Sequence, residues 1–210
     1  MRSQVVDVAR GLAFCAMVHW HAAWFADDAG LVALDMQSLP WRASQRAIAG
    51  TFFLLVGVSM RFGSSGWRLA RIAACAAVVT ATSAVLDPGR LVTFGILHAI
   101  FLASVLARPF ARLGAWAAIP GALAAAVGAT TSDPRFDHPL LVWTGLGTTV
   151  PPTFDHQPFV LWFGVVLVGI AVPVPRWEVR APALAWMGRH SLWLYMAHVP
   201  VLRGIVLLLA

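Results

Sequence analysis

Long apolar runs separated by short polar segments follow one another along the whole chain. A helix needs about 20 predominantly apolar residues to cross a membrane, with a range of roughly 17 to 25. We expect seven such helices, at residues 5–25, 47–60, 69–86, 91–110, 113–130, 159–174 and 183–209. The second run is short, so its helix is either kinked or extended by the polar residues before it, whereas the last is long enough to begin in the membrane interface. The stretch 139–146 is too short to span. The pattern predicts an all-α, polytopic transmembrane bundle of about seven helices.

Composition agrees with this class and indicates one domain. Of the 210 residues, 60% are hydrophobic and 11% are charged, whereas a soluble protein has roughly 25% charged residues. With no long polar linker, we predict a single domain over residues 1–210. Asp7 and Arg10 interrupt the first apolar run, so we expect it to be retained rather than cleaved as a signal peptide. Cys15 and Cys75 lie in apolar runs without metal-ligand spacing, so no metal site is predicted.

The positive charge follows the alternation of the loops. The chain has a net charge of +6 and no lysine, so every cationic side chain except histidine is arginine. The N-terminal end and every second loop after it contain Arg2, Arg10, Arg61, Arg68, Arg71, Arg108, Arg112, Arg176, Arg180 and Arg189. The other loops contain Arg42, Arg46, Arg90 and Arg135, together with seven aspartates. Cytoplasmic loops are the basic ones. The charge therefore indicates topology rather than nucleic-acid binding, and it predicts a cytoplasmic N-terminus.

The first predicted helix carries a polar stripe. A helix turns about 100° per residue, so Asp7, Arg10, Phe14, Met17 and His21 share one face. Asp7 and Arg10 form an i, i+3 pair, and His21 lies three turns beyond Arg10, roughly 16 Å along the axis. An ionisable residue inside a membrane is a functional hypothesis by default. The alternatives are snorkelling and pairing with Asp7 for Arg10, and a structural hydrogen bond for His21.

Further polar groups fall at similar depths in other predicted helices. His98 lies about two turns into the fourth helix, Asp155 and His156 lie at the outer mouth of the sixth, and His198 lies deep in the seventh. We therefore expect His21, His98, Asp155 and His156 to meet on the outer side, with His198 below them.

Five stretches carry a family resemblance. They are "DVARGLAFCAMVHWH", "AGTFFLLVGVSM", "FGILHAI", "QPFVLWFGVVLVGIA" and "GRHSLWLYMAHVPVL". In order and spacing they resemble the catalytic-domain family of heparan-alpha-glucosaminide N-acetyltransferase, in its short bacterial form. The Asp-x-x-Arg-Gly opening is also similar to the membrane acyltransferase type 3 family.

The resemblance implies an enzyme of the bacterial cytoplasmic membrane that moves an acetyl group from acetyl-CoA to an amine or hydroxyl of a sugar-like acceptor. The residues that match the family's motifs in this role are His21, Asp7, Arg10, His98, Asp155 and His198. There are two departures from the family pattern. Leu161 replaces the usual proline before Trp162, and no acidic residue directly follows His21.

The chemistry of the donor fits these positions. Acetyl-CoA carries phosphate charges that arginines can hold, and its thioester arm is long. We expect the phosphates to bind at Arg10 and Arg189, and the resemblance adds His190, Ser191 and Tyr195 of the family's last-helix motif to the donor site. His21 then acts as general base on the acceptor or accepts the acetyl group itself. The expected partners are acetyl-CoA, the acceptor and the lipid bilayer, without nucleic acid; homo-oligomerisation is left open.

Two other classes of protein fit part of the pattern. Histidines at matched depth, such as His21, His98 and His198, are what bis-imidazole ligation in a haem or quinone protein requires. In a small proton-linked transporter or an assembly subunit, Ala49, Gly50 and Gly57 would be packing contacts and the histidines a proton relay.

Overall fold

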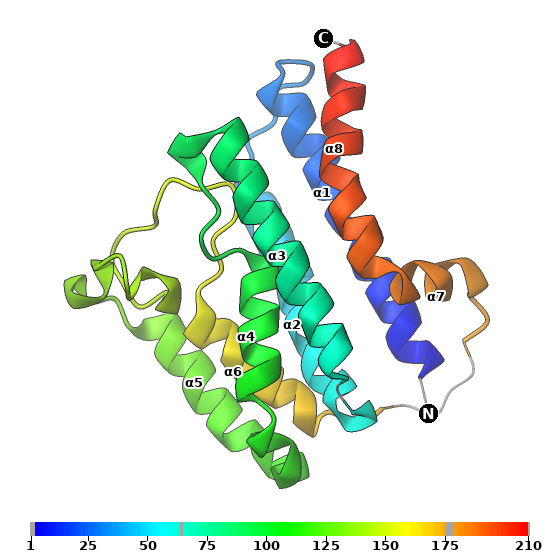
Figure 1. The fold of residues 1–210 in the computed structure, drawn as a ribbon, viewed down its shortest axis with the longest axis vertical. Helices are drawn as coiled ribbons and strands as arrows, with labels where there is room; N and C mark the ends of the chain where they lie inside the picture. The colour runs from blue at the N-terminus through cyan, green and yellow to red at the C-terminus, as the bar shows by residue number, and fades with distance from the viewer. Residues whose placement is uncertain (1–2, 64, 175–178, 210) are drawn as a thin grey trace. The chain divides into compact units, whose positions relative to one another are not determined.

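The computed structural model describes residues 3–63, 65–174 and 179–209, and within these ranges it contains helices and no strand. The α-helices are α1 Gln4–Asp28, α2 Leu39–Ser59, α3 Gly66–Leu86, α4 Ile96–Leu106, α5 Ala118–Thr130, α6 Phe159–Ala171, α7 Pro182–Arg189 and α8 Ser191–Leu209 (Figure 1). The prediction of an all-α protein is confirmed. The second helix begins at Leu39, so of the two expected alternatives, a kink or an extension by the preceding polar residues, the extension is found.

Four helical segments of the described chain are long and apolar enough to cross a membrane. They are Leu39–Phe62, Gly66–Leu86, Pro109–Thr130 and Ser191–Leu209. Two shorter apolar helices, Ile96–Leu106 and Phe159–Ala171, accompany them. The helix α1 is outside this set, and it is the one that carries the polar stripe. The fold is that of a helical membrane protein.

The chain divides into two compact units. Unit 1 contains Met1–Phe52 and Val174–Ala210, and unit 2 contains Phe53–Pro173. The boundary falls within α2, so one helix contributes residues to both units. Each unit is described by itself below, and the single domain over residues 1–210 stays a prediction.

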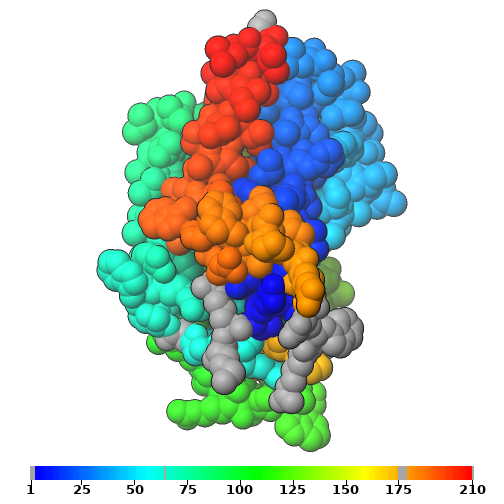
Figure 2. Space-filling model, turned by 90° about the vertical axis from the view of Figure 1, so that its right-hand side faces the viewer, coloured from blue at the N-terminus to red at the C-terminus, as the bar shows by residue number. Residues whose placement is uncertain are grey.

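In unit 1, α7 and α8 pack against α1, and Figure 2 shows α7 in orange and α8 in red beside the blue α1. The backbones of α1 and α7 approach closely at two glycines. A Cβ atom added at Gly11 would overlap the carbonyl oxygen of Leu184, and one added at Gly188 would overlap that of Asp7. Small residues at helix crossings permit such an approach in membrane proteins.

The predicted last helix at 183–209 is wrong as a single element, because the chain turns at His190. The backbone of His190 has φ −104° and ψ 12°, and its N–H donates to the carbonyl oxygens of Trp186 and Met187. Figure 1 shows α7 running across the direction of α8. Gly188, near the end of α7, packs onto Asp7 and holds α7 against α1. The chain therefore changes direction at His190 before α8 begins.

In unit 2, α6 packs on α5 and on the second half of α2 through glycines. A Cβ atom added at Gly121 would approach the backbone of Gly164 and Val168, and one added at Gly57 would overlap the carbonyl oxygen of Val166. The buried Phe53 of α2 stacks on Trp162 of α6, with ring centroids 5.2 Å apart.

The fourth helix begins at Ile96 rather than at residue 91. The backbone N–H of Ile96 donates to the Asp155 carboxylate over 2.6 Å, and the N–H of Gln157 donates to the Phe94 carbonyl oxygen over 3.2 Å. The N–H of Val92 donates to the Ser83 hydroxyl over 3.0 Å. These long-range bonds hold residues 91–95 in an extended connection, and His98 therefore lies in the first turn of α4 rather than two turns into it.

Candidate functional site

The charged pair at the start of α1 forms as its spacing predicts. Arg10 Nη1 lies 3.3 Å from Asp7 Oδ1, and the Asp7 residue is 3% exposed. Gly188 packs on the backbone of Asp7, and Arg189 follows it directly at the end of α7. The charged motif of the first helix and the start of the last-helix motif thus adjoin one another within unit 1.

The geometry of His198 defines the tautomer of its imidazole. Its Nδ1 lies 2.5 Å from the carbonyl oxygen of Tyr195. A carbonyl oxygen only accepts hydrogen bonds, so Nδ1 carries the hydrogen and, in the neutral ring, Nε2 carries the lone pair. His198 is 6% exposed, and none of the described residues provides a hydrogen-bond partner for its buried Nε2. The ring presents a basic nitrogen inside the protein.

His21 of α1 lies directly against His198 of α8. The two ring centroids are 4.9 Å apart, with an angle of 80° between the planes. His21 Nδ1 is 2.9 Å from the Met17 carbonyl oxygen, so His21 also carries its hydrogen on Nδ1 in the neutral form. Phe14 and Tyr195 contact the His198 ring at centroid distances of 6.2 and 5.2 Å. The polar stripe of α1 therefore leads from the Asp7–Arg10 pair to two contacting imidazoles.

The residues predicted to hold the donor lie around the junction of α7 and α8. Arg189 and His190 are exposed, and Ser191 is the first residue of α8. His190 Nδ1 is 2.9 Å from the Trp186 carbonyl oxygen, and the His190 ring lies 4.6 Å from that of Trp186. This junction therefore carries an exposed guanidinium next to an imidazole that makes a tilted contact with an indole.

His98, in unit 2, has both ring nitrogens in hydrogen bonds. Its Nδ1 accepts from the Gly95 N–H over 3.3 Å, and its Nε2 lies 3.1 Å from Thr80 Oγ1. The Thr80 hydroxyl donates to the Val92 carbonyl oxygen over 2.7 Å, so it accepts from His98 Nε2–H. His98 thus ties α3 to the start of α4.

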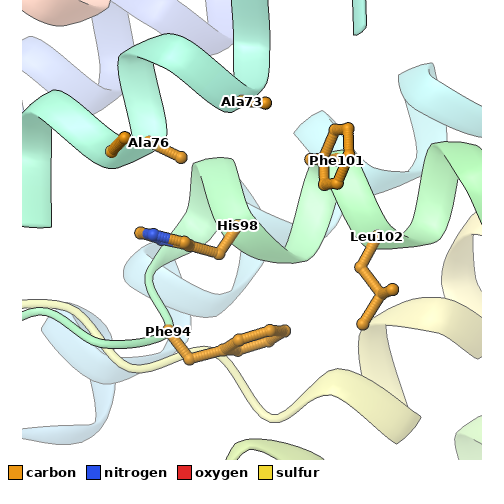
Figure 3. A pocket seen from close by; sticks show the side chains of 7 residues that line it. Ala73, Ala76, Phe94, His98, Phe101 and Leu102 are labelled. Atoms are coloured by element: carbon orange, nitrogen blue, oxygen red, sulfur yellow. The ribbon is translucent and has the colours of Figure 1, made fainter. Parts of the chain in front are cut away.

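His98 also lines a pocket of about 340 Å³ in unit 2. Figure 3 shows the ring between Phe94 on one side and Ala76 of α3 on the other. The remaining lining residues are Ala73, Ala77, Phe101 and Leu102. The only polar side chain in this set is that of His98.

Asp155 uses both carboxylate oxygens for contacts within unit 2. Oδ2 accepts from the Ile96 N–H, and Oδ1 accepts from the Gln157 side-chain amide over 2.7 Å. Burial lowers the pKa of the neighbouring His156, and the charge of Asp155 opposes that effect. Asp155 therefore joins the connection before α6 to the N-terminus of α4, where a negative charge is favourable.

The structure thus brings the predicted site residues together in two groups, one in each unit. Unit 1 contains the group Asp7, Arg10, His21, Tyr195 and His198, and unit 2 contains His98 with Asp155. The predicted meeting of His21 with His98 stays a prediction. Thr80 and Phe53 were not predicted, because a threonine or a phenylalanine in an apolar run gives no signal of the partner that it contacts.

No three His, Cys, Asp or Glu side chains gather into a potential metal site in the described part of the chain.

Compared with known proteins, residues 2–200 match the family model described as heparan-alpha-glucosaminide N-acetyltransferase, catalytic. No curated protein and no solved structure matched the chain. The match covers nearly the whole sequence. The chain therefore belongs to the heparan-alpha-glucosaminide N-acetyltransferase catalytic family, and this membership implies a membrane acetyltransferase.

Proposed function

We propose that this protein transfers the acetyl group of acetyl-CoA to an amine or hydroxyl of a sugar-like acceptor in a bacterial cytoplasmic membrane. The main support for the proposal is the buried Nε2 of His198. The hydrogen bond from Nδ1–H to the Tyr195 carbonyl oxygen leaves the lone pair of the neutral ring on Nε2, so Nε2 is the basic nitrogen. A neutral imidazole with a fixed tautomer is the form that a general base requires.

In the direct route, the acceptor nitrogen or oxygen attacks the thioester carbonyl carbon while His198 Nε2 takes its proton. A bond forms between the acceptor and the acetyl carbon, and the carbon–sulfur bond breaks. The coenzyme A thiolate leaves and takes the proton from His198, which restores the neutral imidazole. The product is the acetylated acceptor and free coenzyme A.

His21 offers a second route. It is less buried than His198, and its Nε2 carries the lone pair when the ring is neutral. His21 Nε2 attacks the thioester carbonyl carbon, the carbon–sulfur bond breaks, and coenzyme A leaves as the thiolate while the acetyl group stays on His21. The acceptor then attacks the acetyl carbon, the bond to Nε2 breaks and restores the neutral imidazole, and the acceptor's proton passes through His198 to the thiolate. His198 then serves as the base for that displacement. The two routes differ in whether the acetylated protein forms.

We place the phosphates of the donor at Arg10 and Arg189. Arg10 is fixed by Asp7, and Arg189 follows the glycine that packs on Asp7. Charge-assisted hydrogen bonds to phosphate are about twice as strong as neutral ones. His190, Ser191 and Tyr195 belong to the same segment of chain and complete this proposed binding set.

His98 and Asp155 take a positioning role in this proposal. Each side chain makes two hydrogen bonds that hold the start of α4 in place. His98 bonds to Gly95 and Thr80, and Asp155 bonds to Ile96 and Gln157. Removing either side chain leaves buried backbone groups without their partners, which costs about 1–3 kcal/mol. We expect Asp155→Ala to lower the melting temperature, and the activity per folded molecule to fall much less than in a His198 variant.

The test measures transfer of radiolabelled acetyl from acetyl-CoA to amino sugars by the detergent-purified protein, together with its melting temperature. His198→Ala should lower transfer by about 10²- to 10⁴-fold, the range for loss of a general base, while stabilisation by acetyl-CoA persists. His138→Ala, at an exposed histidine, is the matched control and should leave transfer unchanged. Full transfer by His198→Ala would remove the base from this mechanism.

Two further measurements separate the routes and the classes of protein. The second route is supported if the protein retains labelled acetyl in the absence of acceptor and His21→Ala loses this label. The first route is supported if the wild-type protein retains no label.

An absorption spectrum tests the haem alternative. The two imidazoles contact edge to face, whereas haem ligation places iron between the ring nitrogens, so we expect no Soret band.

A further inference from the structure

Unit 2 contains an apolar pocket that the reaction above does not use. It measures about 340 Å³ and lies between α3 and α4, and Figure 3 shows Ala73 of α3 across from Phe101 and Leu102 of α4. The pocket opens at the surface of the unit, because its lining residue Ala77 is exposed and Phe101 and Leu102 are partly exposed. Its volume is within the range of ligand pockets, roughly 300–1,000 Å³.

The pocket lies near the middle of a helix that is long and apolar enough to cross a membrane. This helix, α3, begins at Gly66 and ends at Leu86. The lining residues Ala73 and Ala77 follow Gly66 by 7 and 11 residues (73 − 66 and 77 − 66), which is about 10 and 16 Å along the axis. The hydrocarbon core of a bilayer is about 30 Å thick. The pocket therefore opens at the depth of lipid chains rather than at that of headgroups or water.

The chemistry of the lining favours hydrocarbon over water. His98 is the only polar side chain among the lining residues, and its two ring nitrogens are already engaged with Gly95 and Thr80. A water molecule in a cavity needs about 2–4 polar partners, whereas an empty cavity forfeits the dispersion contacts of its lining. A hydrocarbon chain restores these contacts and requires no hydrogen bond.

Two arginines lie toward one end of this pocket, one on each side of it. Arg68 of α3 precedes Ala73 by five residues, about 8 Å along the helix, and Arg108 follows Leu102 by six residues, about 9 Å. Because α3 and α4 run in opposite directions (Figure 1), both arginines lie at the same end of unit 2. Both are exposed.

The segments that contain these arginines have no acidic side chains. Residues 53–86 and 96–132 include no Asp and no Glu. Trp67, next to Arg68, is 71% exposed, and tryptophan is enriched at the headgroup level of membranes. Arg68 and Arg108 therefore present positive charge at the membrane interface without a carboxylate from their own segments, which favours an anionic lipid.

We propose that unit 2 binds one anionic phospholipid, with part of an acyl chain in the α3–α4 pocket and the phosphate at Arg68 and Arg108. The phosphate of a phospholipid lies just outside the hydrocarbon core, whose edge is about 15 Å from its centre, and the long arginine side chain reaches this level from within the core. Basic pockets between transmembrane helices bind such headgroups. The inference involves unit 2 alone and is independent of acetyl transfer.

The test measures the melting temperature of the detergent-purified, delipidated protein with added phosphatidylglycerol. Phosphatidylcholine with the same chains tests the requirement for negative charge, and inorganic phosphate tests the requirement for a chain. We expect phosphatidylglycerol to raise the melting temperature, phosphatidylcholine to raise it much less, and inorganic phosphate to leave it unchanged.

The phosphate contact is tested by Arg68→Gln combined with Arg108→Gln. Each arginine near an anionic lipid surface strengthens binding about five-fold, so the double variant should need roughly 30-fold more phosphatidylglycerol for half of the full shift. The matched control combines Arg90→Gln with Arg135→Gln, which removes two positive charges at the other end of unit 2. It should respond as the wild-type protein does.

The chain contact is tested by Ala77→Leu, which places a larger side chain at the opening of the pocket and should abolish most of the stabilisation by phosphatidylglycerol. Ala74→Leu is the control, because Ala74 is an exposed residue of α3 outside the pocket lining. Native mass spectrometry of bound phosphatidylglycerol provides a second readout if a variant melts at a lower temperature.

Four results would overturn the inference. Phosphatidylglycerol could fail to stabilise the wild-type protein, or phosphatidylcholine or inorganic phosphate could stabilise it equally well. The arginine double variant could keep the wild-type response. Finally, Ala77→Leu could bind phosphatidylglycerol as Ala74→Leu does, which would place the lipid outside this pocket.

Discussion

At the scale of single residues, Gly188 packs directly on the backbone of Asp7 in unit 1. The glycine has no side chain to separate α7 from α1, and the buried Asp7 carboxylate holds Arg10 on the same helix. The position of Arg189 therefore depends on the absence of a Cβ atom one residue earlier.

Gly188→Ala should destabilise the protein by about 1–3 kcal/mol, the usual cost of overpacking, and should weaken stabilisation by acetyl-CoA. Gly204→Ala is the matched control. No atom lies within 4 Å of a Cβ added at Gly204 of α8, and alanine favours a helix over glycine by about 1 kcal/mol. Melting temperatures of the two variants give the comparison, and equal values would contradict this account of the α1–α7 crossing.

Residue spacing predicts some of the site and not the rest. The Asp7–Arg10 pair and the stripe to His21 follow from helix geometry, because i, i+3 neighbours share a face wherever the helix lies. The contact of His21 with His198 joins residues 177 positions apart (198 − 21) and depends on how α8 packs on α1. The tautomer of His198 depends on the contact of its Nδ1 with the Tyr195 carbonyl oxygen of the same helix.

At the scale of elements, the loop between α5 and α6 is organised by Asp137. The Thr148 hydroxyl donates to its carboxylate over 2.5 Å, and the backbone N–H groups of Thr148 and Thr149 donate over 2.7 and 3.0 Å. These bonds lower the pKa of Asp137 below its ordinary value of 3.8, with the Thr148 hydroxyl as the largest cause. The ionised carboxylate of Asp137 is therefore the form that holds the two ends of the 137–149 loop together by hydrogen bonds.

A lowered pKa sets the sign of the pH effect. The stabilisation of this loop is fully present above pH 3.8 and is lost as the pH falls through the lower pKa of the folded state. Hydrogen exchange of the Thr148 and Thr149 amides, measured between pH 6 and pH 2, should report this loss as a rise beyond the intrinsic rates. In Asp137→Asn, the Thr148 and Thr149 amides should exchange faster than in the wild-type protein at pH 6, and their protection should depend much less on pH. A wild-type loop that stays equally protected at low pH would contradict the role of the carboxylate.

At the scale of the whole molecule, charge is segregated between the two ends of unit 2. Its α2–α3 and α4–α5 connections, with the adjoining helix ends, contain Arg61, Arg68, Arg71, Arg108 and Arg112. Its α3–α4 and α5–α6 connections contain four aspartates and only two arginines, namely Asp87, Asp133, Asp137 and Asp155 with Arg90 and Arg135. Figure 1 shows α3 and α4 running in opposite directions, which places alternate connections at the same end. Basic connections face the cytoplasm in most membrane proteins.

We predict that the arginine-rich end faces the cytoplasm. In a background in which Cys15 and Cys75 are replaced by alanine, Ser132→Cys should react with a membrane-impermeant maleimide in intact cells. Ser65→Cys should react only after the membrane is permeabilised. Both serines are exposed and lie in opposite connections of unit 2, so each is the control for the other. The reverse pattern would invert the topology, and labelling of both in intact cells would mean that residues 65 and 132 lie on one side.

The sequence by itself determined the helical membrane class, the family and the polar stripe of α1. These depend on composition, on the order of motifs and on the periodicity of one helix, which are properties of the chain without regard to packing. Only the tertiary structure decided where the last helix breaks, where α4 begins and which histidine retains a buried basic nitrogen. Each of these depends on partners remote in sequence, namely Asp7 beneath Gly188, Asp155 at Ile96 and His21 beside His198, and no local pattern specifies such a partner.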